Sequence, residues 1–148
     1  MKEEILKVTV RPLNRFNWEM AVNLELEDYQ SDFLPDNLYS IAQAKFEDLE
    51  PMGIFAGEAM VGFAMYGNFG GVCWINRIMV DKHHQEKGYG KKAVKIILDK
   101  LKTRPDCDEI RTSFVKQNAL AEYFFSSMGF VRIADGLDGE IVMRWLPE

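Results

Sequence analysis

The stretch from Trp74 to Leu101, WINRIMVDKHHQEKGYGKKAVKIILDKL, decides how the rest of the chain is interpreted. Residues 74–80 are apolar and β-branched enough to form a buried strand. The loop after it contains Gly88 and Gly90, which lack a β-carbon and leave backbone N–H groups open to close approach. Apolar residues then repeat at the spacing of one helix face: Val94, Ile97, Leu98 and Leu101. A helix N-terminus with bare amides and flanking lysines favours a bound phosphate group.

The pattern of this loop is compatible with more than one phosphate ligand. Residues 88–93, GYGKKA, fit the G-x-G-x-x-A form of the dinucleotide-binding fingerprint. A nicotinamide cofactor also needs an acidic residue at the end of the next strand, yet the strand expected at 109–115 ends in FVK. An ordinary strand-to-helix turn without a ligand is the third interpretation.

Length and composition indicate an ordinary globular protein. The 148 residues fit one domain, 1–148, with 47% hydrophobic and 28% charged residues. The sequence has no apolar run long enough to span a membrane and no signal-peptide pattern, so we expect a cytoplasmic protein without a membrane partner. Cys73 and Cys107 have no metal-ligand spacing around them, and we expect reduced thiols in the core and no bound metal.

Charge is distributed unevenly along the chain, whose net charge is −5. The first charged segment, residues 19–50, has a single base, Lys45, and these acids: Glu19, Glu25, Glu27, Asp28, Asp32, Asp36, Glu47, Asp48 and Glu50. The charged residues between 77 and 104 are mostly basic. One segment therefore favours a cation and the other an anion, although each is also compatible with a solvated helix face. The acidic pI of about 5.1 argues against a nucleic-acid partner.

Hydrophobic periodicity and turn signals predict the order β-α-α-β-β-β-α-β-α-β-β. The strands are expected at 5–10, 52–56, 59–66, 74–80, 109–115, 130–134 and 140–145, and the helices at 17–28, 37–46, 89–103 and from Asn118 to Met128. This order predicts a single α/β domain with a mixed sheet flanked by helices. Glu25, Glu27 and Asp28 would lie at the C-terminal end of the first helix, where the helix dipole disfavours them, which hints at a ligand.

Two motifs resemble the GCN5-related N-acetyltransferase (GNAT) superfamily. The first is Q-x-x-G-x-G from Gln85 to Gly90, which resembles its acyl-CoA pyrophosphate loop. The second runs from Asn118 through Ala121 and Phe125 to the pair Gly129-Phe130, and resembles an Asn-capped helix beside the pantetheine arm. Residues 61–67 and 138–143 are also similar to bacterial spermine/spermidine acetyltransferases. Together the resemblance covers roughly residues 52–146.

The resemblance implies a site for acetyl-CoA. Backbone groups around Ile78, Met79 and Val80 would pair with the pantetheine arm and polarise the thioester carbonyl. Asn118 and Phe125 would lie beside the same arm. The pyrophosphate would be held by the loop residues Gln85, Glu86, Lys87, Gly88, Tyr89, Gly90 and Lys91.

The family resemblance also bears on the residues that would catalyse the transfer. Many family members have a tyrosine at the position of Phe125, and its hydroxyl is thought to protonate the leaving thiolate; a phenyl ring has no such proton. Glu27 is a candidate general base, and Asn76, expected on the same side of its strand as Ile78 and Val80, is a candidate for orienting the amine. Glu27, Asp28 and Asp32 are candidates for binding a polycationic substrate. His83 and His84 are interpreted as exposed loop residues rather than metal ligands.

Three hypotheses follow from these patterns. The chain is an N-acetyltransferase that acetylates a small polycation such as spermidine or spermine, or another amine such as an amino acid, an aminoglycoside or a peptide N-terminus. Alternatively, it is a GNAT domain that binds acyl-CoA without turnover, as the missing tyrosine suggests. The third hypothesis is a nicotinamide-dependent oxidoreductase. A homodimer is left open.

Overall fold

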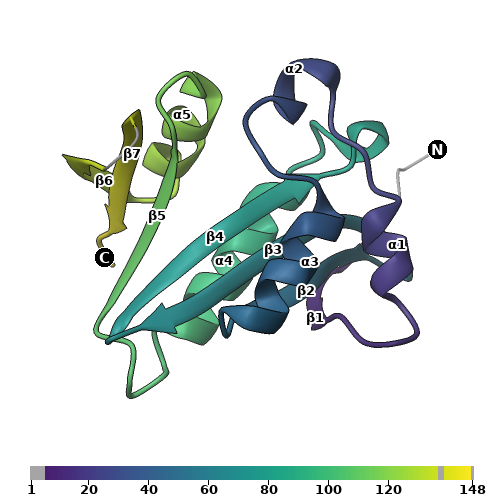
Figure 1. Ribbon diagram of the computed structural model, residues 1–148, viewed down its shortest axis with the longest axis horizontal. Coiled ribbons are helices and arrows are strands. Elements are labelled where there is room, and N and C mark those ends of the chain that lie inside the picture. The colour runs from purple at the N-terminus through teal and green to yellow at the C-terminus, as the bar shows by residue number, and fades with distance from the viewer. Residues whose placement is uncertain (1–5, 137–138, 148) are drawn as a thin grey trace.

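The computed structural model describes residues 6–136 and 139–147, which form a seven-stranded sheet in the order β1-β2-β3-β4-β5-β7-β6 (Figure 1). Strands β4 and β5 are parallel, and the other neighbouring pairs are antiparallel. The elements are β1 (Val8–Pro12), α1 (Trp18–Val22), α2 (Asp28–Ser31), α3 (Asn37–Phe46), β2 (Glu50–Ala56), β3 (Ala59–Phe69), β4 (Val72–Val80), the 3-10 helix η1 (Lys82–His84), α4 (Tyr89–Leu101), β5 (Glu109–Val115), α5 (Ala119–Ser127), β6 (Phe130–Asp135) and β7 (Glu140–Trp145). The predicted α/β fold with a mixed sheet is confirmed.

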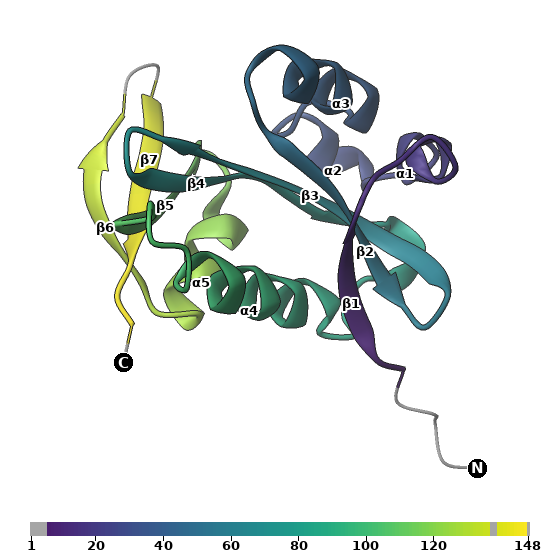
Figure 2. The ribbon, with the colours of Figure 1, turned by 90° about the horizontal axis from the view of Figure 1, so that it is seen from below.

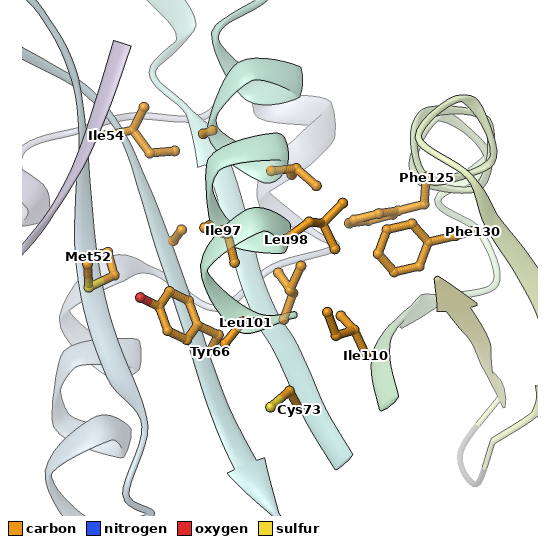
Figure 3. Packing of buried hydrophobic residues seen from close by; sticks show 14 of the residues in the cluster. Met52, Ile54, Tyr66, Cys73, Ile97, Leu98, Leu101, Ile110, Phe125 and Phe130 are labelled. Atoms are coloured by element: carbon orange, nitrogen blue, oxygen red, sulfur yellow. The ribbon is translucent and has the colours of Figure 1, made fainter. Parts of the chain in front are cut away.

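Helix α4 covers one face of the sheet, and helices α1 and α3 cover the other (Figure 2). The main core lies under α4, where its apolar face meets inward-facing residues of the strands; Figure 3 shows Leu98 and Leu101 among Tyr66, Ile110 and Phe125. The buried residues of α4 are Ala93, Val94, Ile97, Leu98 and Leu101, which include all four predicted core positions of this helix.

A second core lies on the opposite face, where Phe63, Met65 and Met79 of the sheet pack against Ala21 of α1 and Ala44 of α3.

Of the two cysteines, Cys73 is buried, Cys107 is partly buried, and both are free. Burial, with the neighbouring Cys107 thiol, raises the pKa of Cys73 to about 12. Within the described residues, no helix combines the length and the apolar character that a membrane crossing needs.

The prediction of one helix at 17–28 is wrong. Helix α1 ends at Val22, and α2 begins at Asp28. Between them the backbone of Glu25 makes tertiary bonds instead of helical ones: its N–H donates to the Asp81 carboxylate at 2.8 Å, and its carbonyl oxygen accepts from the Lys82 N–H at 2.7 Å. Glu27 and Asp28 therefore lie at the N-terminus of α2, where the helix dipole favours negative charge, so their position is not the unfavourable one that was expected.

Other boundaries differ by a few residues. The first strand was expected at 5–10 but is described at Val8–Pro12, with residue 5 outside the described part of the chain. β3 extends to Phe69, three residues further than expected, and α4 ends at Leu101 rather than Thr103. Side chains cap two helices: Asp36 accepts from the Tyr39 N–H at 2.7 Å, and Asn118 accepts from the Ala121 N–H at 3.2 Å, as expected for an Asn-capped helix.

Candidate functional site

The central feature of the site is a split between the two parallel strands. β4 and β5 pair only from Val72 opposite Glu109 to Ile75 opposite Thr112, and the Thr112 hydroxyl donates to the Ile75 carbonyl oxygen at 2.9 Å at the last paired step. Beyond this step β4 continues beside β3, and β5 continues beside β7. Figure 1 shows the two strands separating toward α2 and α5.

A β-bulge in β4 marks the point of separation. Opposite β4, Tyr66 pairs with Ile75 and Met65 pairs with Arg77, so Asn76 is the extra residue. A bulge increases the local twist and bends the strand that contains it. It also breaks the strict alternation of side chains, which explains why Cys73 and Ile75 belong to the core under α4 while Met79 belongs to the core on the other face.

A cleft of about 460 Å³ lies between α2 and the end of β4 on one side and α5 on the other. It is lined mainly by apolar groups and by a few side-chain amides from α2, the end of β4 and α5. The lining residues are Leu26, Tyr29, Gln30, Phe33, Leu34, Ile78, Met79, Val80, Gln85, Gly90, Gln117, Asn118, Ala119, Leu120, Ala121, Phe124 and Phe125. A long, mostly apolar cleft with a few convergent polar groups is the usual form of a small-molecule site.

Backbone groups of β4 face this cleft. The Asp81 N–H donates to the Val61 carbonyl oxygen of β3 at 2.8 Å. Because the backbone groups of a strand alternate in direction, those of Val80 and Ile78 are directed away from β3, toward the edge that β5 has left. The Val80 carbonyl oxygen accepts there from the Gln85 side-chain amide at 2.9 Å. The N–H groups of Ile78 and Val80 are thus available to a bound molecule.

The N-terminus of α4 lies at one end of the cleft. Gly88 is its N-cap in the left-handed conformation, with φ of 79°, and Glu86 has φ of 64°. The first turn has no acidic residue, and Lys87 and Lys91 flank it. Free N–H groups, the helix dipole and two lysines at this terminus would favour a phosphate group.

The predicted cofactor residues fall into two groups. One group lines the cleft: Ile78, Met79, Val80, Gln85, Gly90, Asn118 and Phe125. The other surrounds the N-terminus of α4 without lining the cleft: Glu86, Lys87, Gly88, Tyr89 and Lys91. Gly90 belongs to the first turn of α4 and also lines the cleft, so the two groups are adjacent along the chain.

Phe125 closes the cleft from the side of α5. Its ring is only 3% exposed, is stacked on Phe114 with centroids 6.0 Å apart, and meets Phe124 and Phe130 edge-on at 5.1 Å. Tyr123, two residues earlier, is 75% exposed and does not line the cleft. The nearest tyrosine on this helix therefore does not replace the hydroxyl that Phe125 lacks.

The predicted catalytic and substrate residues do not line the cleft. Glu27, Asp28 and Asp32 belong to α2 or its ends, and their side chains are absent from the lining. Asn76 is also absent, because the bulge breaks the alternation on which its predicted orientation depended; its Oδ1 atom is buried without a hydrogen-bond partner in the described structure.

Helix α2 was missed by the sequence interpretation, and it supplies one wall of the cleft. Its Gln30 and the loop residue Gln85 exchange side-chain hydrogen bonds of 2.9 and 3.3 Å. The signal was present in the sequence, since Leu26, Tyr29, Gln30 and Phe33 follow the spacing of one helix face.

A buried carboxylate attaches this wall to the end of β4. Asp81 Oδ1 accepts from the Glu25 N–H at 2.8 Å; Asp81 Oδ2 accepts from the His83 N–H at 3.1 Å and lies 3.2 Å from Nδ1 of the His83 ring. Burial alone would raise the pKa of Asp81, but these hydrogen bonds lower it below its ordinary value. His83 therefore contacts a carboxylate, and within the described residues no group of three acidic, histidine or cysteine side chains is arranged to hold a metal ion.

Carboxylates before and at the start of α2 act on an ammonium group of the protein itself. The Lys82 amine lies 3.0 Å from the Glu25 carboxylate. Hydrogen bonding to Glu25 raises the pKa of Lys82 above its ordinary value, and the charges of Glu27 and Asp28 raise it further. The carboxylates of this segment therefore favour the positive charge of Lys82.

Comparison with known proteins decides the family. Residues 18–130 match the acetyltransferase (GNAT) family. The chain belongs to this family. Membership confirms an N-acetyltransferase that uses an acyl-CoA donor, so the nicotinamide hypothesis is discarded, and the residues of the cleft become candidates for holding that donor.

Individual relatives agree with this assignment. The chain is 27% identical over 134 residues to a "Probable spermine N(1)-acetyltransferase" of Bacillus subtilis subsp. natto (strain BEST195), an alignment that covers 84% of this chain and 88% of the relative. The fold resembles the ribosomal-protein-S18-alanine N-acetyltransferase of Escherichia coli, with a TM-score of 0.74, 20% identity, and 94% and 93% of the two chains covered. It also resembles the spermidine N-acetyltransferase of Vibrio cholerae in complex with CoA and spermine, with a TM-score of 0.71, 16% identity, and 93% and 92% covered.

Proposed function

We propose that this GNAT enzyme transfers the acetyl group of acetyl-CoA to a primary amine of a polyamine such as spermidine or spermine. The observation that carries this proposal is the composition of α2 and its flanks. Along residues 26–33, side chains that line the cleft alternate with carboxylates that do not: Glu27, Asp28 and Asp32. The same short segment thus provides a wall for the cleft and a negative rim. The similarity to a spermine acetyltransferase supports the same substrate class.

We propose that acetyl-CoA occupies the cleft between β4 and β5. The N–H groups of Ile78 and Val80 bind the pantetheine arm and polarise the thioester carbonyl, as an oxyanion site does. The N-terminus of α4, from Gln85 to Lys91, binds the pyrophosphate. Asn118 and Phe125 at α5 form the other wall of the pantetheine channel. The apolar character of the lining suits the thioester end of the donor.

The reaction then needs a neutral amine beside the thioester. An ammonium group has no lone pair, and its ordinary pKa is about 10.4, so the amine must lose a proton before it attacks. Entry into an apolar cleft favours the neutral form. The amine attacks the carbonyl carbon directly in a ternary complex, and the thiolate of CoA leaves. We propose Glu27 as a base that accepts the amine proton through water, because its side chain does not line the cleft.

A polyamine has further ammonium groups that do not react and that need a negative partner. The carboxylates of Glu27, Asp28 and Asp32 at the rim are the candidates, and the raised pKa of Lys82, caused first by Glu25, supports an environment there that favours positive charge. We propose that the non-reacting ammonium groups bind at this rim while the reacting amine enters the cleft. The two free thiols suit the reducing cytoplasm, where we propose that the enzyme works.

One observation favours a second function, the binding of acyl-CoA without turnover. Phe125 occupies the position where many GNAT enzymes have the acidic tyrosine, and its ring has no proton to give. The two functions differ in whether thiol is released. Release of CoA from acetyl-CoA with spermidine, spermine, lysine, an aminoglycoside or a peptide as acceptor supports an enzyme and identifies the amine, whereas tight acetyl-CoA binding with no release supports the second function.

The polyamine proposal is tested by removing the negative rim. We expect the triple variant Glu27→Gln/Asp28→Asn/Asp32→Asn to raise the spermidine KM several-fold, because an exposed ion pair contributes about 0.2–1 kcal/mol and three are lost together. The acetyl-CoA KM should not change, and the salt dependence of kcat/KM should weaken.

A matched control removes three exposed carboxylates elsewhere, in the variant Glu58→Gln/Asp99→Asn/Asp106→Asn, which makes the same change in net charge. It should leave the spermidine KM close to that of the wild type. If both triple variants raise the spermidine KM equally, the effect comes from net charge and not from binding at the rim. If the wild type prefers a mono-amine, the polyamine assignment is wrong.

A further inference from the structure

The cleft contains few groups that could give a proton to a leaving thiolate. Phe125, at the usual position of the acid, has a phenyl ring. Among the described residues that line the cleft, Tyr29 is the one with an ionisable side chain; the others are apolar, glycine, or carry amides. If a side chain in the cleft wall protonates the thiolate, it must therefore come from α2 rather than from α5.

The other tyrosines of the chain are elsewhere. Tyr66 is fully buried in the core, where its hydroxyl accepts a hydrogen bond from Lys100 Nζ at 2.9 Å. Tyr89, the first residue of α4, packs against the same core. Tyr39 and Tyr123 are exposed and do not line the cleft. Tyr29 is 58% exposed, so both the cleft and solvent reach it.

Helix α2 is held in place by bonds on both sides of Tyr29. On the N-terminal side, the backbone N–H of Glu25 is bonded to the Asp81 carboxylate and its carbonyl oxygen to the Lys82 N–H. On the C-terminal side, Gln30 exchanges side-chain hydrogen bonds with Gln85, which is itself bonded to the Val80 carbonyl oxygen. These contacts fix α2 against the end of β4 and the loop before α4, next to the proposed position of the thioester.

We propose that Tyr29 is the general acid of this enzyme and that it replaces the tyrosine missing at Phe125. The inference rests on the proposed function. As the amine nitrogen bonds to the acetyl carbon, the carbon–sulfur bond breaks and its electron pair stays on sulfur. The phenolic O–H of Tyr29 gives its proton to that sulfur, forming the CoA thiol. The resulting phenolate takes the surplus proton from the acylated nitrogen, so the tyrosine is regenerated and the transfer from the neutral amine has no net proton requirement; the proton that the ammonium loses beforehand leaves through Glu27 and water.

The test compares Tyr29→Phe with the wild type, using acetyl-CoA and the amine that the wild type acetylates fastest. General acids contribute about 10²- to 10⁴-fold, and a thiolate is a good leaving group, so we expect kcat to fall about 10- to 100-fold at neutral pH with little change in the acetyl-CoA KM. The loss should shrink above about pH 8.5, where a free thiol ionises without help. The pH profile of kcat should therefore differ between the wild type and the variant.

Two further variants complete the test. Tyr123→Phe removes an exposed hydroxyl from α5 outside the cleft and should behave as the wild type. The double variant Tyr29→Phe/Phe125→Tyr should regain much of kcat, because it returns a hydroxyl to the same cleft from the opposite wall. Circular dichroism and thermal unfolding confirm that each variant is folded.

The outcomes separate this inference from the proposed function. A wild type that releases no CoA with any amine overturns both. A wild type that turns over, together with Tyr29→Phe that has the same kcat and the same pH profile, overturns the role of Tyr29 alone. A rise in the amine KM with unchanged kcat would also overturn it, because that result describes substrate binding rather than proton transfer.

Discussion

Gly88 provides a quantitative test of the site at the N-terminus of α4. Its φ of 79° lies in the left-handed region, and nothing lies within 4 Å of the position that a β-carbon would occupy. A substitution there is therefore strained by the backbone angle and not by a collision in the free protein. A residue other than glycine in this conformation costs roughly 1–2 kcal/mol, and a β-branched residue is a true outlier.

The variant Gly88→Val should therefore give up the left-handed conformation and turn the N–H groups of the loop away from the pyrophosphate. Acetyl-CoA can bind only if the loop is forced back, so the conformational cost is taken from the binding free energy. At 1.4 kcal/mol for each factor of ten, about 1–2 kcal/mol raises the dissociation constant about 5- to 30-fold. The fold should survive, because Gly88 is exposed.

Isothermal titration with acetyl-CoA and thermal unfolding measure these two quantities. Gly70→Val is the matched control, because Gly70 has φ of 65°, has equally open space around its β-carbon position, and lies in the turn between β3 and β4, far from α4 along the chain. It should lose about 1–2 kcal/mol of stability with no change in acetyl-CoA affinity. Wild-type affinity in Gly88→Val would refute the assignment of this loop to the pyrophosphate.

Two other predictions concern Phe125 and Asp81. Phe125→Tyr should leave kcat unchanged or raise it modestly in a thiol-release assay, since the ring is already packed and only an oxygen is added; activity that appears only in this variant would favour a wild type that binds without turnover. Asp81→Asn should lower the free energy of unfolding at pH 7 by about 1.5–3 kcal/mol, because Asp81 accepts three hydrogen bonds as a carboxylate. Its pKa is lowered from 3.8, so this stabilisation is present above that value and is lost as the pH falls below it. Urea unfolding at pH 7 and pH 3 should show the difference shrinking in acid, and a constant difference would contradict this account.

Much of the fold followed from signals that act over a few residues along the chain. The apolar face of α4, the bounds of β5 at Glu109–Val115, and the Asn118 helix cap all agree with the sequence. Each of these features depends on neighbours within about one helical turn or on simple alternation, so the residues that cause it are adjacent in the sequence. The same holds for the glycine-containing loop at the N-terminus of α4.

The cleft itself depends on tertiary structure. Nothing local to Asn76 indicates a bulge, because a bulge exists only relative to the partner strand β3. The separation of β4 from β5 arises because the two strands pair with different neighbours beyond their short parallel segment. The end of α1 and the start of α2 are likewise set by Asp81, more than fifty residues away, whose carboxylate binds the Glu25 N–H. The sequence by itself therefore determined most of the elements and the glycine-containing loop before α4, but not α2. Only the tertiary structure brought Tyr29 into the cleft and kept the predicted carboxylates outside it, because those positions depend on hydrogen bonds between distant segments.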